Sequence, residues 1–300
     1  MTFLDDFLLD LQLRGLAPTT IESNIYIMRR YLAWCEAQSL DPANAGRGDL
    51  KSYLAYRRAE GKKVATLRKI FSTLTTFYEW LEEEGKSSAS PIRAVKKKYL
   101  RSYKMDAESR KIISIEEAAK MVAATLGTRD RAILLVFLKT GIRKGELISL
   151  DTSDISLDGL SITLKPTAKR SNRIVFFDEE TAEALQRWLK ARAKLVAQDS
   201  ALFIGEGGIR LNRGGVRLVV VKAAVRVGLA DPHSKKMEER FSPHCCRHWH
   251  ATHLLRSGMP REYVQWLRGD KTKEAVDIYY HIDPEDVRKS YLAHIPQLGI

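Results

Sequence analysis

The sequence predicts a mainly helical fold with one small antiparallel sheet, divided into two domains. Residues 1–85 carry only helical patterns of apolar residues. Residues 86–111 lose that periodicity and become basic, and residues 155–177 change to runs of β-branched and aromatic residues. The expected divisions are a helical domain at 1–86, a basic linker at 87–111 and a mixed domain at 112–300.

The composition is typical of a folded, water-soluble protein with a polyanionic partner. Apolar residues make up 44% and charged residues 29%, and 50 Lys and Arg against 37 Asp and Glu give a net charge of +13. No apolar run approaches the roughly 20 residues that span a bilayer, and acids stand at the N-terminus where a secretory signal needs positive charge. Three cysteines are too few for a disulfide framework. We therefore expect a cytoplasmic protein with no membrane association.

Helix start and stop signals define the first domain. Thr19 and Glu22 have the spacing of a capping box, Asp49 is expected to cap a helix, and Gly85 is expected to end one. The expected helices run over residues 3–14, from Thr19 to the polar stretch 38–41, from Asp49 to Gly61 and from Val64 to Glu84.

The expected linker is strongly basic. From Arg93 to Lys111 there are eight Lys or Arg and two acidic residues. Such a run is typical of a solvated linker, and it also suits a tether that lies along a phosphate backbone. The two interpretations are compatible.

The second domain begins with Ser114 and Glu117, which form another capping box. An apolar helix over 129–139 should stop at Gly141. The runs Ile162–Leu164 and Arg173–Phe177 predict a hairpin with a basic tip at 169–172. Further helices are expected at 179–198, at 213–227 (with a valine-rich strand as the alternative), at 243–257, at 261–268 and through 272–292.

Two arginine motifs are suited to binding phosphate. In Thr-Gly-Ile-Arg-Lys-Gly-Glu-Leu, a glycine turn followed by a helix start places Arg143 in a first turn, with Glu146 able to orient its guanidinium. A surface ion pair is the alternative. In the second motif Ser242 suits an N-cap, so that His244 and Arg247 share one face of the first turn. Two arginines around one phosphate would spread the charge of a pentacoordinate transition state.

The histidines and cysteines between 233 and 253 raise a zinc site as an alternative. No second ligand pair follows at zinc-finger spacing, and we expect no metal. His248, Trp249 and His250 are expected to be core or helix-packing residues rather than catalysts. The sequence contains no phosphate-binding glycine loop, so we expect chemistry without a nucleotide or other cofactor.

A third motif, Leu-Arg-Gly-Asp ending at Asp270, is followed nine residues later by Tyr279. A tyrosine at such a position usually packs. Taken in order with the two arginine motifs, however, these residues resemble the tyrosine recombinase and integrase family. The resemblance covers residues 114–292, and it is especially close in the His-x-x-Arg-His-x-x-Ala-Thr-His-Leu-Leu stretch that begins at His244. Residues 1–85 resemble the family's helical, SAM-like core-binding domain in helix pattern and position.

The resemblance implies a role for each motif residue. Arg143 and Arg247 would bind the scissile phosphate with help from His244, and Tyr279 would be the nucleophile. The hairpin would supply the general acid, either Lys169, which we favour, or Lys165. Asp270 stands where the family usually has histidine or tryptophan, and an ionised carboxylate accepts hydrogen bonds but donates none. The expected catalytic residues are Arg143, Lys169, His244, Arg247, Asp270 and Tyr279.

The resemblance also implies a fold, a partner and an activity. We expect a two-domain clamp on double-stranded DNA, with a homo-tetramer joining two specific recombination sites. The C-terminal helix within 283–300, with Val287, Tyr291 and Leu292 on one face, would dock onto a neighbouring protomer.

The enzyme would cleave and rejoin DNA through a 3′-phosphotyrosyl intermediate. Integration or excision of a mobile element, as in the archaeal integrases that the chain resembles, is the favoured role. Xer-like resolution of chromosome dimers and topoisomerase-like relaxation are alternatives. Two alternatives come from other functional classes: a DNA-binding protein that has lost catalysis, and a zinc-dependent binding module.

Overall fold

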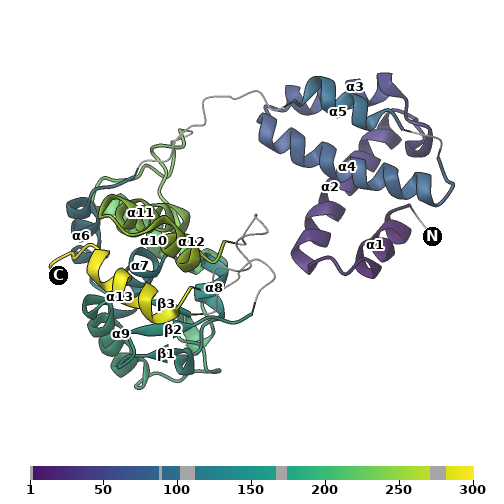
Figure 1. The fold of residues 1–300 in the computed structure, drawn as a ribbon. Helices are drawn as coiled ribbons and strands as arrows, with labels where there is room; N and C mark the ends of the chain where they lie inside the picture. The colour runs from purple at the N-terminus through teal and green to yellow at the C-terminus, as the bar shows by residue number, and fades with distance from the viewer. Residues whose placement is uncertain (1–2, 88–89, 102–111, 167–173, 235, 271–281) are drawn as a thin grey trace. The chain divides into compact units, whose positions relative to one another are not determined.

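The computed structural model describes residues 3–87, 90–101, 112–166, 174–234, 236–270 and 282–300. The chain forms two compact units, Met1–Ala107 and Glu108–Ile300 (Figure 1). Helices dominate, and the described strands form one three-stranded antiparallel sheet in the second unit. This confirms the predicted fold class.

The first unit is entirely helical where it is described. Its core is rich in aromatic residues, and Tyr31, Tyr53, Phe71, Phe77 and Tyr78 are all fully buried. The elements are α1 (Phe3–Leu13), α2 (Pro18–Ala37), the 3-10 turn η1 (Pro42–Asn44), α3 (Arg47–Ala59), α4 (Val64–Glu83) and α5 (Ile92–Tyr99).

Two local predictions for this unit were wrong, and one differs in position. The predicted capping box at Thr19 is absent, because α2 already begins at Pro18 and its N-cap, Ala17, has no side-chain cap. Asp49 does cap the start of α3, but from the third helical position, where its carboxylate accepts a 2.9 Å hydrogen bond from the backbone nitrogen of the N-cap residue, Gly46. The stretch expected to be aperiodic contains α5, which buries Ile92 in the core of the first unit.

The second unit combines helices with a small sheet that lies at one side of it, beside α9 (Figure 1). Its elements are α6 (Ile115–Ala123), α7 (Thr128–Thr140), α8 (Lys144–Ser149), η2 (Thr152–Asp154), β1 (Ile155–Ser156), β2 (Ser161–Thr163), β3 (Ile174–Phe176), α9 (Glu179–Arg192), η3 (Glu206–Gly208), α10 (Arg213–Arg226), α11 (Pro243–Arg256), α12 (Arg261–Arg268) and α13 (Pro284–His294).

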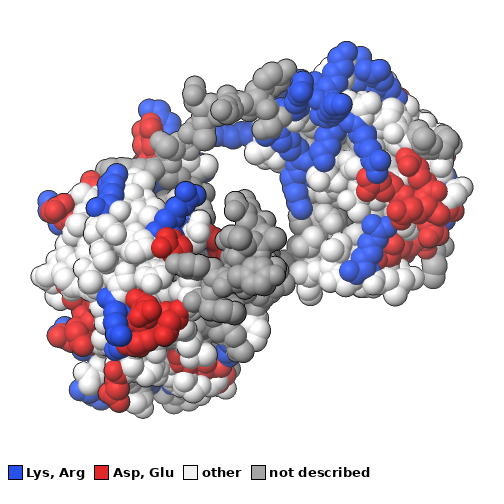
Figure 2. Space-filling model, in the orientation of Figure 1, with Lys and Arg blue, Asp and Glu red and all other residues white. Residues whose placement is uncertain are grey.

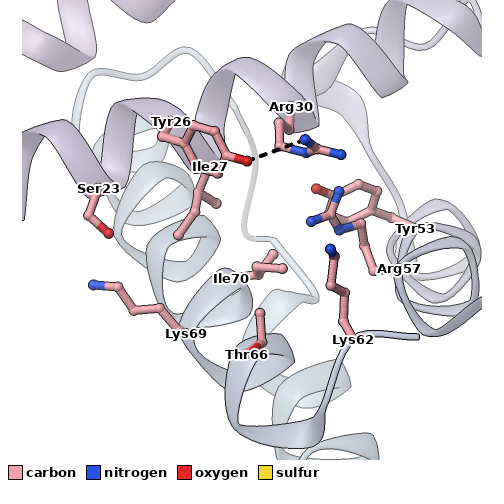
Figure 3. A pocket seen from close by; sticks show the side chains of 10 residues that line it. All are labelled: Ser23, Tyr26, Ile27, Arg30, Tyr53, Arg57, Lys62, Thr66, Lys69 and Ile70. Atoms are coloured by element: carbon pink, nitrogen blue, oxygen red, sulfur yellow. Dashed lines mark hydrogen bonds between the residues drawn. The ribbon is translucent and has the colours of Figure 1, made fainter. Parts of the chain in front are cut away.

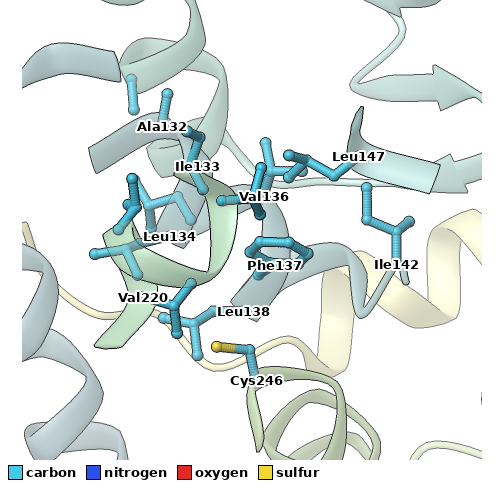
Figure 4. Close-up of a cluster of buried hydrophobic side chains, with 14 of the residues drawn as sticks. Ala132, Ile133, Leu134, Val136, Phe137, Leu138, Ile142, Leu147, Val220 and Cys246 are labelled. Atoms are coloured by element: carbon cyan, nitrogen blue, oxygen red, sulfur yellow. The ribbon is translucent and has the colours of Figure 1, made fainter. Parts of the chain in front are cut away.

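Helix α7 is the centre of this unit. All of its residues from Ala132 to Thr140 are buried, and α9, α10 and α11 pack around it. Figure 4 shows its side chains meeting Val220 of α10 and Cys246 of α11. A helix that is apolar on every side is stable only when other elements enclose it. The central helix therefore fixes where the turn after it, at Gly141, lies in the unit.

Several predictions for this unit are confirmed. Ser114 and Glu117 form the capping box of α6, with hydrogen bonds of 3.1 and 2.8 Å. Gly141 ends α7 in the left-handed region, at φ 60°. Strands β2 and β3 pair as a hairpin with Ile162 opposite Val175, while its tip lies outside the described residues. Residues 213–226 are helical, so the alternative strand is wrong.

The C-terminal helix α13 packs on its own unit. Val287 and Tyr291 are fully buried, and the Tyr291 hydroxyl donates to the backbone oxygen of Lys139 at 2.8 Å. Beyond the helix, Glu180 accepts hydrogen bonds from the backbone nitrogens of Leu298 and Gly299 at 2.9 and 2.6 Å. The continuous helix expected over 272–292 begins, within the described residues, at Pro284.

Charge is unevenly distributed on the first unit. On the face drawn in Figure 2, Lys and Arg gather over α3, α5 and the start of α4, and acidic side chains gather at the opposite end of this unit. The basic region includes the exposed residues Arg58, Lys62, Lys97 and Lys98. Such a patch attracts polyanions.

Candidate active site

Arg143 is the N-cap residue of α8, one position before the first turn in which it was predicted. Its backbone nitrogen donates to Glu146 Oε2 at 2.6 Å, and its Nη1 lies 3.1 Å from Glu146 Oε1. The Glu146 side chain is 5% exposed and that of Arg143 is 34% exposed. The buried Glu146 carboxylate therefore holds the Arg143 guanidinium on one side, while the rest of the Arg143 side chain is partly exposed. This is the contact that the spacing of the two residues predicted.

Arg247 lies in the first turn of α11 and is buried. Its Nη1 donates to the Gly141 backbone oxygen at 2.8 Å, and its Nη2 donates to the Arg268 backbone oxygen at 2.7 Å. Arg247 therefore joins the turn before α8 to the end of α12. These main-chain contacts bring the second arginine beside the first.

Asp270 lies between the arginines. Its Oδ1 is 3.4 Å from Arg247 Nη2 and 3.6 Å from Arg143 Nη2, and its Oδ2 is 2.8 Å from Arg268 Nε. One carboxylate thus contacts three guanidinium groups. An ionised carboxylate in this position orients cations and partly neutralises them, and it offers no proton to an anion.

His244 is exposed at the start of α11, and its Nε2 is 3.0 Å from the Nε2 of His248. His248 is not a core residue: it is exposed one turn after His244, and the two rings pack edge to face, which is the helix-packing alternative. Trp249 and His250 are buried as predicted. The exposed histidine pair leaves His244 accessible to a ligand at this end of α11.

The two arginines and His244 line a cavity of about 290 Å³. Lys144 and Arg217 line the same cavity, and neither was predicted from the sequence. Lys144 directly follows Arg143, so the first arginine motif already contained it. Arg217 comes from α10, which packs on α8, and no motif in the sequence marked it. The cavity therefore gathers cations from three separate segments.

The predicted nucleophile and general acid lie outside the described residues. Tyr279 and its neighbour Tyr280 fall within 271–281, and Lys169 falls within 167–173. The alternative lysine, Lys165, forms an ion pair with Asp151, which also accepts from Arg210 Nη2 at 2.6 Å. Hydrogen bonds from Lys165 and Arg210 hold the pKa of Asp151 well below its usual range. Lys165 therefore belongs to a network of ion pairs in which Asp151 also contacts Arg210.

Within the described ranges, no three metal-ligating side chains gather at one point. The cysteines near His244 face the interior instead: Cys245 and Cys246 are buried, and burial raises the pKa of the Cys246 thiol well above its usual range. The described helices also include none that is both long and apolar enough to cross a bilayer.

Comparison with known proteins places the chain among recombinases. The model of the phage integrase family matches residues 107–286, and that of the N-terminal SAM-like domain of phage integrases matches residues 3–86. Tyrosine recombinase XerC of Xanthomonas axonopodis pv. citri is 30% identical over 314 residues, covering 99% of this chain and 97% of that protein. Tyrosine recombinase XerD of Listeria monocytogenes serotype 4b is 28% identical, covering 93% and 94%.

Solved integrase structures have the same fold. The Tn1549 transposon integrase in complex with circular intermediate DNA has a TM-score of 0.69 at 16% identity, covering 97% of this chain and 98% of that one. A lambda integrase dimer bound to a COC′ core site has a TM-score of 0.67 at 21% identity, covering 90% and 94%.

Proposed function

The chain belongs to the phage integrase family and is a tyrosine-type site-specific DNA recombinase, and from this premise we propose how its residues divide the reaction. Arg143 and Arg247 bind the scissile phosphate, His244 assists them, and Tyr279 attacks. The observation that carries the proposal is the cavity where Arg143, at the start of α8, meets His244 and Arg247 of α11. Two guanidinium groups beside one phosphate stabilise the charge that develops in the transition state.

The proposed step exchanges one phosphodiester for another. The Tyr279 hydroxyl gives its proton to His244 as its oxygen forms a bond to phosphorus, the bond from phosphorus to the 5′-oxygen breaks, and Lys169 gives a proton to that departing oxygen. The products are a 3′-phosphotyrosyl ester and a 5′-hydroxyl, and attack by the 5′-hydroxyl of a different strand reverses the step. Because the bond energy is retained in the phosphotyrosine, the reaction needs no nucleotide.

Asp270 positions the arginines in this scheme. Its contacts with Arg143 and Arg247 keep two like charges together before phosphate binds. We expect Asp270→Ala to lower the cleavage rate and Asp270→His, which can donate to phosphate, to retain or raise it. Rates of covalent adduct formation on one duplex decide the matter, and an unchanged rate in Asp270→Ala would remove the residue from the site.

The partner we propose is double-stranded DNA carrying a specific recombination site, bound by a homo-tetramer that exchanges α13 between protomers. The DNA complexes of the Tn1549 and lambda integrases support a DNA partner. We retain the expected division into a core-binding domain at 1–86, a basic linker at 87–111 and a catalytic domain at 112–300. Integration or excision of a mobile element is the proposed setting. Xer-like resolution of chromosome dimers is the second candidate, favoured by the match to XerC over nearly the whole chain.

Identification of the nucleophile tests the proposal directly. Consecutive helical residues point about 100° apart, so Tyr279 and Tyr280 on a helix cannot both face one phosphate. Protein incubated with DNA should form a covalent adduct in wild type and Tyr280→Phe, and none in Tyr279→Phe. A peptide map with the nucleotide on Tyr280 would reassign the nucleophile. Sequencing the trapped DNA would also identify the recombination site.

The general acid has its own test. Lys169→Ala should cleave normal DNA slowly and recover on DNA whose bridging 5′-oxygen is replaced by sulfur, a leaving group that needs no proton. Lys165→Ala is the matched control, and its ion pair with Asp151 predicts a change in stability without sulfur rescue. Rescue of Lys165→Ala alone would transfer the role to Lys165.

A further inference from the structure

A cavity of about 320 Å³ lies inside the first unit, between α2, α3 and the start of α4. Figure 3 shows Arg30, Arg57 and Lys62 pointing toward one another, with the Tyr53 hydroxyl among them and Ile70 on the wall. No part of the proposed active site contributes to this cavity, whose lining residues all belong to the first unit.

Two polar atoms of the cavity wall are buried without a hydrogen-bond partner in the described part of the chain: the Tyr53 hydroxyl and Arg57 Nε. Their residues are 0% and 5% exposed. Buried polar groups in folded proteins are normally satisfied, and leaving one unpaired costs free energy. Burial raises the pKa of Tyr53 to about 12, so its hydroxyl keeps its proton. The cavity thus contains two unused donors.

The charge of the cavity is positive. Four cationic residues line it, and Glu60 pairs with two of them, at 3.3 Å from Arg30 and 3.0 Å from Arg57. Lys62 and Lys69 make no ion pair within the described residues. Four positive charges less the one negative charge of Glu60 leave +3. Unused donors together with excess positive charge suit an anion that has several acceptor oxygens.

We propose that this cavity binds one phosphate group, held by the Tyr53 hydroxyl, Arg57 and Lys62, and that in the working enzyme this is a backbone phosphate of DNA. The assignment of this phosphate to DNA rests on the proposed function. Lys62, which lines the cavity, also belongs to the basic patch of the first unit shown in Figure 2. A free phosphate is the other source of the same chemistry, and the experiment separates the two.

The first arm measures noncovalent binding of full-length protein to a duplex across a salt series. Lys62→Gln should weaken binding roughly tenfold at 0.1 M salt and reduce the slope of log affinity against log salt by about 0.9, as for one lost phosphate contact. Tyr53→Phe should weaken binding roughly fivefold with an unchanged slope, because it removes a neutral donor. Glu60→Gln should strengthen binding, because it removes the competing carboxylate. Lys51→Gln, on the same helix α3 but outside the cavity, is the matched control.

The second arm follows the melting temperature of the same proteins in inorganic phosphate, against chloride at equal ionic strength. Phosphate-specific stabilisation that Tyr53→Phe abolishes, with duplex binding unchanged, identifies free phosphate as the source. If Tyr53→Phe, Lys62→Gln and Glu60→Gln all match Lys51→Gln in both arms, the proposal is wrong. It is also wrong if Tyr53→Phe merely unfolds more easily while both binding readouts stay at wild-type values.

Neither arm requires DNA cleavage. Failure of wild type to form an adduct would therefore count against the proposed function and leave the phosphate measurement intact. Conversely, normal adduct formation in variants that show no binding change would remove the cavity from the DNA interface while retaining the recombinase chemistry.

Discussion

At the scale of single residues, the two arginines of the candidate site differ in how firmly they are held. The Arg143 side chain is 34% exposed and is held at one end by Glu146, whereas the Arg247 side chain is 7% exposed and donates to two backbone oxygens. Arg247 therefore supports the fold as well as the site. We expect Arg143, whose side chain is more exposed, to contribute mainly to the proposed phosphate site.

This difference predicts separable effects. Arg143→Ala and Arg247→Ala should each slow cleavage roughly 100-fold, the usual effect of removing one preorganised donor from a transition state. Arg247→Ala should in addition lower the free energy of unfolding by roughly 1–3 kcal/mol, because buried carbonyls lose their donor. Adduct rates and urea unfolding measure the two effects.

Arg187→Ala, which removes an exposed ion pair with Glu183 on α9, is the matched control and should change neither quantity much. The interpretation fails if Arg143→Ala cleaves at the wild-type rate, or if both site variants lose the same stability.

The sequence predicted the local part of this site and missed its long-range part. Glu146 was expected to orient Arg143 because the two are three residues apart on one helix start, and the structure shows that contact. The bonds from Arg247 to the Gly141 and Arg268 backbones join distant segments, and no spacing rule predicts them. Arg217 escaped notice for the same reason. Tyr279 and Lys169 were predicted to be the nucleophile and the general acid only because the order of the motifs resembles that of the family.

At the scale of helices, end signals were reliable where side chains close the end locally. The Ser114 box and the Gly141 stop both depend on neighbouring residues, and both were predicted. Helix α5 was missed because four of its eight residues are basic, and Ile92 and Val95 are its buried apolar residues. Tertiary burial, which the local pattern does not contain, stabilises such a short helix.

Gly141 joins α7 to the arginine site, so its replacement should affect both stability and catalysis. The left-handed φ of 60° costs alanine roughly 1–2 kcal/mol, and an added Cβ would lie 2.6 Å from His250 Nδ1. Because the Gly141 oxygen accepts from Arg247, the displaced turn should slow cleavage as well. Unfolding and adduct rates measure the two consequences.

Gly228→Ala is the matched control for Gly141→Ala. Gly228 has φ 72° with nothing within 4 Å of an added Cβ, so it isolates the backbone strain in the same unit. Equal losses in the two variants would show that the His250 contact and the Arg247 bond contribute nothing.

The burial of His253 on α11 predicts that the stability of the protein depends on pH. The ring is buried against Trp249 and lies 3.1 Å from the Ile113 oxygen. Burial lowers the pKa of His253, an effect increased by Arg256 and opposed by the Ile113 contact and Glu116. As the pH falls, His253 in the unfolded chain, with an ordinary pKa of ~6.5, binds a proton before His253 in the folded protein does. Stability should be complete above that pH and should fall as the pH drops toward the folded value.

Urea unfolding between pH 5 and 8 measures this dependence. His253→Gln should flatten the curve in that window, and His233→Gln, at an exposed position, should not. A His253→Gln curve as steep as that of wild type would assign the pH dependence to other groups.

At the scale of the whole molecule, the proposed tetramer depends on the C-terminal segment, which in this structure packs on its own unit. This segment is attached to its own unit by several hydrogen bonds. The fully buried Lys139 donates to the Pro296 oxygen at 2.6 Å, and the Tyr291 hydroxyl donates to the Lys139 oxygen. Lys139 is itself held by an ion pair with Asp178 and by a 2.6 Å hydrogen bond to Glu180. Release of the segment alone would be costly. Exchange with an identical neighbour restores every contact, so the net cost of a swapped tetramer is small.

The structure and the proposed tetramer therefore predict that DNA changes which chain each C-terminal segment contacts. Ser257 Oγ donates to the His294 oxygen at 2.6 Å, which joins the end of α11 to the end of α13. In a Ser257→Cys, His294→Cys variant, a short bis-maleimide should give intramolecular cross-links in free protein. On DNA it should give covalent dimers and higher species. The native Cys35, Cys245 and Cys246 are buried and should contribute little background. Each single-cysteine variant is the control, and purely intramolecular cross-linking on DNA would mean that α13 stays on its own protomer and that another surface joins the tetramer.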